Sequence, residues 1–137
     1  MTGLDKSDMT TVLTCALILA LWSLPLNYLP TIARFAVGGV EWGLSNRETM
    51  PAIPPWAERA ERARKNHFEN LPMILVVLLI VQITEQANPI INGAAIGIVA
   101  LRVMHGFAYV LGVPLLRSLA FVGSLLSLFL ILWQLFV

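Results

Sequence analysis

Residues 59–72 read RAERARKNHFENLP, and this stretch joins a dense group of charges directly to an uncharged run. The run, from Asn70 to Thr84, has 15 residues, which is about 22 Å of helix at about 1.5 Å per residue. Because a hydrocarbon core is about 30 Å thick, a helix that spans it here has to draw polar residues to the membrane boundary or below it. Glu69 and Asn66 are the first of these. The stretch therefore predicts a membrane helix with polar groups in its inner half.

The whole chain is far more apolar than a soluble domain. Of its 137 residues, 58% are hydrophobic and 12% are charged, whereas soluble domains carry about 25% charged residues. Three further uncharged runs cover residues 9–33, 86–101 and 118–137, and a spanning helix needs about 20 apolar residues. We therefore predict an all-α integral membrane protein, an up-down four-helix bundle that forms one domain over residues 1–137.

Turn-forming residues set the predicted limits of the spans. We place the four spans, in chain order, at about residues 9–33, 56–84, 89–111 and 118–137. Pro25 and Pro30 are expected to kink or end the first helix. Asn88-Pro89 and Gly112-Val113-Pro114 are turn signals that separate the last three helices. Small residues also recur at packing distance, which favours close helix contacts, at Gly93 and Gly97 and at Gly123 and Ser127.

Positive charge is unevenly divided along the chain. Six of the nine Lys and Arg residues lie between the first two uncharged runs and Arg117 lies before the last one, whereas the loop between the middle helices has none. The positive-inside rule therefore places loops 34–55 and 112–117 in the cytoplasm and both termini outside, in the cell (inner) membrane. The net charge of +1 gives no indication of a nucleic-acid partner. Three of the cations are expected to be solvated anchors of this topology: Arg59, Arg64 and Lys65.

Two polar stripes are predicted at similar depth in the cytoplasmic leaflet. Each occupies one helix face, with Arg62, Asn66 and Glu69 on the second helix and Arg102, His105 and Tyr109 on the third. The second helix enters from the cytoplasm and the third exits there, so the stripes meet at the same end. Arg117 joins them from the start of the fourth helix.

Ionisable groups at this depth cost several kcal/mol unless they pair or face water. A structural ion pair between Glu69 and Arg102 would satisfy two of them. The set nevertheless has more cationic and donor capacity than one carboxylate can satisfy, and an anionic ligand would complete it. No Ser-His-Asp set is present. His67 and His105, with one nearby Glu, make a weak metal signal, so no metal site is predicted.

Three separated segments together resemble the MAPEG family, the membrane-associated proteins in eicosanoid and glutathione metabolism. They are residues 58–72, Arg102-Val103-Met104-His105 with Tyr109, and Arg117-Ser118. The resemblance implies a homotrimer of four-helix subunits. It also implies that glutathione binds as a thiol co-substrate near the cytoplasmic side, between adjacent subunits.

The resemblance assigns roles to individual residues. Those implied to hold glutathione lie on the second and third helices and are Arg62, Lys65, Asn66, Glu69, Arg102, His105 and Tyr109. Arg117 is similar to the family's thiolate-stabilising arginine, and Ser118 to the adjacent hydroxyl that some members use on the sulfur. Phe121 stands where some members have a tyrosine near the sulfur.

The function implied is that of a glutathione-dependent transferase or peroxidase. Its substrates would be hydrophobic electrophiles or lipid hydroperoxides that enter from the membrane lipid. Two alternatives remain open: a non-catalytic MAPEG-fold ligand-binding membrane protein, and a small multidrug-type transporter. The transporter is disfavoured because it needs an embedded carboxylate on the first helix, and residues 9–33 have none.

Overall fold

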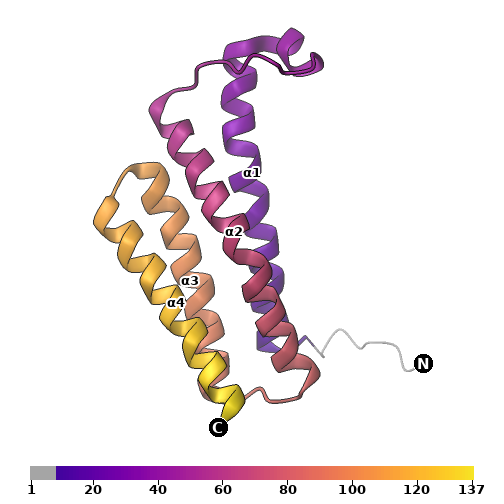
Figure 1. The fold of residues 1–137 in the computed structure, drawn as a ribbon, viewed down its shortest axis with the longest axis vertical. Coiled ribbons are helices and arrows are strands. Elements are labelled where there is room, and N and C mark those ends of the chain that lie inside the picture. The colour runs from indigo at the N-terminus through magenta and orange to yellow at the C-terminus, as the bar shows by residue number, and fades with distance from the viewer. Residues whose placement is uncertain (1–8) are drawn as a thin grey trace, which may run out of the picture.

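Four helices make up the fold, and no strand occurs within residues 9–137, the part of the chain that the structure describes. In this computed structural model the helices are α1 (Thr11–Leu44), α2 (Pro55–Ile83), α3 (Pro89–Leu111) and α4 (Pro114–Phe136). The α1–α2 loop and the α3–α4 turn lie at one end, and the α2–α3 turn and the C-terminus lie at the other (Figure 1). All four helices are long and apolar enough to cross a membrane. The predicted all-α four-helix architecture is confirmed, while the expected outside position of residues 1–8 falls outside the described residues.

The first helix is longer than the sequence predicts. It does not end near Ala33 but continues to Leu44, so the predicted loop over residues 34–55 is wrong and the connection is much shorter. Pro25 and Pro30 both lie inside the helix. Membrane helices tolerate proline where neighbouring helices and local adjustments satisfy the freed backbone groups. Proline is therefore a weaker stop signal in this helix than in a soluble one.

An ion-pair cluster ties the extension of α1 to α2. Arg34 Nη1 lies 2.8 Å from Glu61 Oε2, and Arg64 pairs with the same carboxylate. Glu61 thus bridges two cations at the charged end of the bundle. These contacts explain why the helix continues beyond the uncharged run that the sequence marks.

A single glycine bends the end of α1. Gly39 has φ 68° and ψ −177°, a backbone conformation that side chains with a Cβ rarely adopt. Beyond it the chain turns across the end of the helix (Figure 1). There the Phe35 and Trp42 rings pack edge to face with their centroids 5.7 Å apart. Arg47 Cζ lies 5.1 Å from the Trp42 ring centre. The bend is therefore held by aromatic and cation–π contacts.

The other helix limits lie close to the turn signals. The α3 helix has the predicted bounds, and its N-cap Asn88 accepts hydrogen bonds from the Ile90 and Ile91 N–H groups at 2.9 Å. The α4 helix begins at Pro114 rather than at residue 118, so residues 114–117 form its first turn and not a loop. Proline suits the first helical position, because its fixed φ fits the helix and no N–H is left unpaired. Arg117 is consequently a helical residue.

The apolar core lies between α1, α2 and α3, with α4 added mainly on α3. The most extensive helix contacts are α3 with α4 and α1 with α2, whereas α2 touches α4 only slightly and α1 does not touch it within the described residues. The largest fully buried core side chains come from all four helices and include Leu19, Leu78, Ile91, Ile98 and Ile131. This arrangement leaves much of α4 exposed.

Two of the predicted small residues do lie at the α3–α4 contact. A Cβ on Gly97 would lie 3.3 Å from Ser127 Oγ, and a Cβ on Gly123 would lie 3.0 Å from Leu101 Cδ1. Gly93 differs, because a Cβ there would meet nothing within 4 Å. Close approach therefore depends on Gly97 and Gly123.

A glycine that the sequence did not single out makes the sharpest test of the packing. A Cβ on Gly106 would lie 2.9 Å from Trp22 Cζ2. We expect Gly106→Ala to lower the melting temperature in detergent, because overpacking costs about 1–3 kcal/mol. Gly93→Ala, in the same helix, should leave it unchanged or raise it, since alanine is the better helix former by about 0.5–1 kcal/mol. Equal melting temperatures for the two variants would contradict the Trp22 contact.

Candidate functional site

A buried cation lies at the centre of the polar layer. The Arg102 residue is 3% exposed, and its Nη1 donates to Asn66 Oδ1 at 3.2 Å. Its Cζ lies 5.4 Å from the centre of the Phe121 ring. Within the described part of the chain no carboxylate pairs with it, and its Nε has no hydrogen-bond partner. Because buried charge is costly without a partner, this arrangement favours an anion nearby.

Aromatic rings connect Arg102 to the end of the bundle. His105 is 4% exposed, and its ring packs edge to face on Tyr109 with centroids 5.4 Å apart. Arg117 also contacts Tyr109, because its Cζ lies over the Tyr109 ring, 4.9 Å from the ring centre. A cation over a ring face is attracted by the ring quadrupole, so Tyr109 orients the Arg117 guanidinium.

One cavity lies on the side of these rings where α2 and α4 face each other. It has a volume of about 290 Å³ and is lined by Asn66, His105, Tyr109, Arg117, Ser118, Phe121 and Val122. We call it the Ser118 cavity. Among the residues that the structure describes, no carboxylate lines it, and the Ser118 Oγ donates to the Pro114 carbonyl at 3.0 Å. The cavity thus offers one guanidinium and several neutral polar groups.

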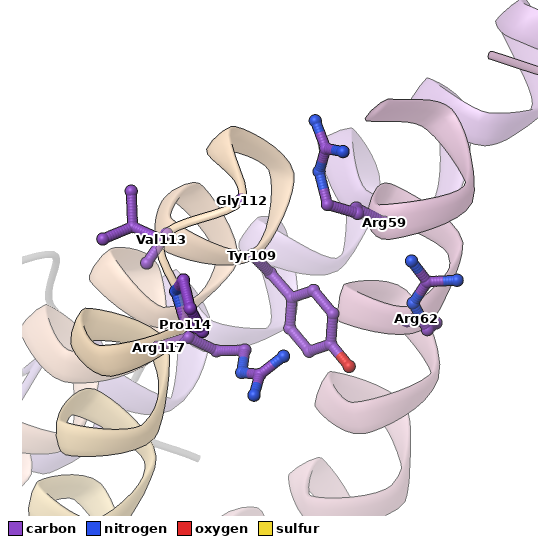
Figure 2. A pocket seen from close by; sticks show the side chains of 8 residues that line it. Arg59, Arg62, Tyr109, Gly112, Val113, Pro114 and Arg117 are labelled. Atoms are coloured by element: carbon purple, nitrogen blue, oxygen red, sulfur yellow. The ribbon is translucent and has the colours of Figure 1, made fainter. Parts of the chain in front are cut away.

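A second cavity adjoins the first and is more strongly cationic. Its volume is about 220 Å³, and its lining consists of Arg59, Arg62, Ala108, Tyr109, Gly112, Val113, Pro114 and Arg117. We call it the arginine cavity. Figure 2 shows Arg59 and Arg62 from α2 on one side of the Tyr109 ring and Arg117 from α4 on the other. Three guanidiniums without a lining carboxylate make this a suitable place for anionic groups.

The two cavities share Tyr109 and Arg117 and therefore form one candidate site. Of the residues expected from the sequence, Asn66, His105, Tyr109, Arg117 and Ser118 line the Ser118 cavity, and Arg62 lines the arginine cavity. Arg102 lines neither cavity but donates a hydrogen bond to Asn66, which lines the Ser118 cavity.

Two expected residues are not brought to these cavities within the protomer. The side chains of Lys65 and Glu69 are 74% and 60% exposed, and their charged atoms lie 4.0 Å apart. The structural ion pair between Glu69 and Arg102 is absent from the described residues, so that alternative is wrong here. The register of the two helices explains this, because Asn66 and not Glu69 faces Arg102.

Arg59 lines the site but was expected to be a solvated anchor. Its Nε donates to the Val110 carbonyl at 2.9 Å, and it borders the arginine cavity. A signal was present in the sequence, since Arg59 and Arg62 are three residues apart and so share a helix face. Because of its charge, Arg59 was interpreted as a solvated anchor of the membrane topology instead.

The buried hydrogen bond to Arg102 can be tested directly. We expect Asn66→Ala to lower the free energy of unfolding in detergent by about 1.5–3 kcal/mol, because it leaves a buried guanidinium without its hydrogen-bond acceptor. Asn70→Ala is the control, since the Asn70 amide donates only to the local Asn66 carbonyl, at 2.8 Å. It should cost clearly less. If both variants lose the same stability, the Asn66–Arg102 contact is unimportant.

Comparison with known protein families covers nearly the whole chain. The model of the MAPEG family matches residues 12–137, which include α2, α3, α4, all of α1 except its first residue, and both cavities. Searches of curated proteins and of solved structures gave no match. Since the match extends over nearly the full length, the chain belongs to the MAPEG family.

Proposed function

We propose that this protein is a glutathione-dependent transferase or peroxidase that acts on hydrophobic electrophiles or lipid hydroperoxides. The observation that carries the proposal is the shared site, in which Arg117 lines two cavities that no carboxylate of residues 9–137 lines. Membership of a family linked to glutathione and eicosanoid metabolism supports it. Glutathione has two carboxylates, one ammonium and a thiol, so a cationic site suits most of its charges.

The size of the cavities fits a ligand that occupies both. Ligand sites usually measure about 300–1,000 Å³. The two cavities here measure about 290 Å³ and 220 Å³, so only the two together reach this range. A tripeptide would therefore extend from Arg59 and Arg62 past Tyr109 to Arg117. Its carboxylates would lie by the α2 guanidiniums and its sulfur by Arg117 and Ser118.

The proposed chemistry uses the sulfur as nucleophile. A permanently charged guanidinium beside the thiol favours the thiolate, which is the reactive form. The thiolate attacks an electrophilic carbon to form a C–S bond and expel the leaving group. With a hydroperoxide the thiolate attacks the terminal oxygen, the O–O bond breaks, and the protonated alcohol leaves a glutathione sulfenic acid. The thiol of a second glutathione then attacks that sulfur and gives the disulfide and water. Ser118 would assist only after its hydroxyl turns from the Pro114 carbonyl to the sulfur.

Lys65 and Glu69 enter the proposal through oligomerisation. Both are exposed charged residues within one turn of Asn66 on a helix that can span a membrane. Such groups are costly against lipid, so a covering protomer would relieve them. We therefore include the homotrimer, with Glu69 holding the glutathione ammonium and Lys65 a carboxylate at the interface between subunits.

The membrane topology follows from charge. The basic residues lie at the end with the α1–α2 loop and the α3–α4 turn, and we assign this end to the cytoplasm and both termini to the outside of the cell (inner) membrane. Glutathione would then enter from the cytoplasm, while the apolar substrate would enter from the bilayer.

A second candidate is a MAPEG-fold protein that binds its ligand without turnover. Phe121 lines the Ser118 cavity and offers no hydroxyl to a sulfur atom. The two candidates are distinguished by assaying purified protein with glutathione and either an aryl halide or a lipid hydroperoxide. Conjugate or alcohol formation above the uncatalysed rate supports the enzyme. Glutathione binding without any product would support the second candidate.

Replacing the cation beside the sulfur should remove most of the activity. We expect Arg117→Ala to lower kcat by about 100-fold or more, as loss of a preorganised electrostatic group does elsewhere, while glutathione binding changes much less. Arg47→Ala is the control, because Arg47 also stacks on an aromatic ring, at 5.1 Å from Trp42, but lines neither cavity. Near-normal turnover by Arg117→Ala would refute its assigned role.

The role of Glu69 is tested by binding rather than by turnover. Glu69→Gln keeps the shape of the side chain but removes the charge that would hold the ammonium. We expect the Kd for glutathione to rise about 10-fold to 100-fold, the equivalent of one charged hydrogen bond. Glu48→Gln, in the α1–α2 loop, should leave the Kd unchanged. If Glu69→Gln alters only the melting temperature, Glu69 has a structural role.

A further inference from the structure

The α3–α4 turn is held by a side chain from a third helix. Arg59, on α2, donates from Nε to the Val110 carbonyl at 2.9 Å. That carbonyl belongs to the last turn of α3, where free carbonyls carry a partial negative charge that a cation stabilises. Within the described residues this is the hydrogen bond that joins α2 to the end of α3.

The turn itself is tight and has little freedom. Gly112 has φ 75°, and the Val113 N–H returns to the Ala108 carbonyl at 2.9 Å. A Cβ on Gly112 would lie 3.3 Å from Arg59 Nε and 3.4 Å from its Cζ. The Arg59 side chain therefore packs directly against the backbone of the turn.

The position of the α3–α4 turn determines where Arg117 lies. The α4 helix starts at Pro114, and the Arg117 N–H donates to the Val113 carbonyl at 3.1 Å. Arg117 is thus in the first turn of α4, immediately after the segment that Arg59 contacts. Since α2 and α4 touch only slightly, the Arg59 hydrogen bond is a direct link between the α2 side of the site and the segment that precedes Arg117.

We propose that Arg59 is a positioning residue, which fixes the α3–α4 turn and through it the distance of Arg117 from the α2 side of the site. This inference rests on the proposed function for its catalytic consequence. Arg59 acts through the donor geometry of its Nε, so its charge alone does not perform the role. Lysine carries the same charge but has no equivalent N–H beside the turn.

The first test measures geometry and is independent of any ligand. In a Cys15→Ser background, spin labels at two exposed positions, Phe68 on α2 and Leu119 on α4, report the distance between the helices in protein diluted with unlabelled copies. We expect a narrow distance distribution for the otherwise unchanged chain and a broader one for both Arg59→Gln and Arg59→Lys. Arg64→Gln, which removes a cation on the same helix that pairs with Glu61, should keep the narrow distribution. An unchanged distribution in both Arg59 variants overturns the proposal.

The second test measures the catalytic consequence through the pH dependence of kcat/KM with glutathione and an aryl halide. Moving a guanidinium away from the thiol should raise the pH of half-maximal kcat/KM by about one unit, a loss of about tenfold at neutral pH. We expect this shift in Arg59→Gln, in Arg59→Lys and in Gly112→Ala, which disturbs the same turn without changing any charge. The KM for the aryl halide should stay the same.

The outcomes separate the inference from the proposed function. A normal pH profile for Arg59→Lys together with a shifted one for Arg59→Gln shows that charge matters, and this overturns positioning. A broadened distance distribution together with unshifted pH profiles also overturns the positioning role of Arg59. If the unmodified protein does not turn over, the proposed function fails, and the spin-label comparison still decides whether Arg59 fixes the turn.

Discussion

The structure depends on accommodating a guanidinium that has no carboxylate partner among residues 9–137. Arg102 is almost fully buried, with an amide on one side and an aromatic ring on the other. Such burial in a membrane helix is expensive and is relieved by an anion or by water. The surrounding layer continues the pattern, because further guanidiniums border the adjoining cavities and no acidic residue in the described part of the chain lines either of them. Positive charge is therefore concentrated where α2, α3 and α4 approach one another.

The way the helices pack makes this concentration accessible. Since α4 rests mainly on α3 and touches α2 only slightly, the space between α2 and α4 is not filled by core side chains. Tyr109, from α3, lies between the α2 arginines and Arg117 (Figure 2) and lines both cavities. Apolar residues such as Val122 border the Ser118 cavity, while arginines border the other. One site thus combines an apolar approach with a cationic one, as the proposed reaction between a lipid-soluble molecule and a thiolate requires.

Sequence reasoning predicted the architecture well because length and composition dictate membrane helices. The bounds of α3 follow from Asn88-Pro89 and Gly112, which act through local backbone geometry. The end of α1 was mispredicted because it depends on tertiary contacts. The Arg34–Glu61 pair and the bend at Gly39 support a helix that the uncharged run alone does not indicate.

The site shows the same division between local and tertiary information. Helical spacing correctly put Asn66 on the face near Arg102, but it could not decide whether Asn66 or Glu69 would be the partner. That choice depends on the rotation of α2 in the bundle, in which Ala63 and His67 lie on the buried face of the helix. The position of Arg59 against the α3–α4 turn was equally hidden, because the sequence does not reveal which carbonyl lies within its reach.

The central claim is that these cations enclose an anionic thiol ligand, and calorimetric titration of the detergent-solubilised protein tests it most directly. Three ligands that differ only at sulfur should be compared: glutathione, its sulfonate, and S-methylglutathione. If Arg117 stabilises negative charge at the sulfur, the sulfonate binds most tightly and the S-methyl compound least tightly at neutral pH. Absence of binding by all three, or equal affinity for the sulfonate and the S-methyl compound, would contradict the account.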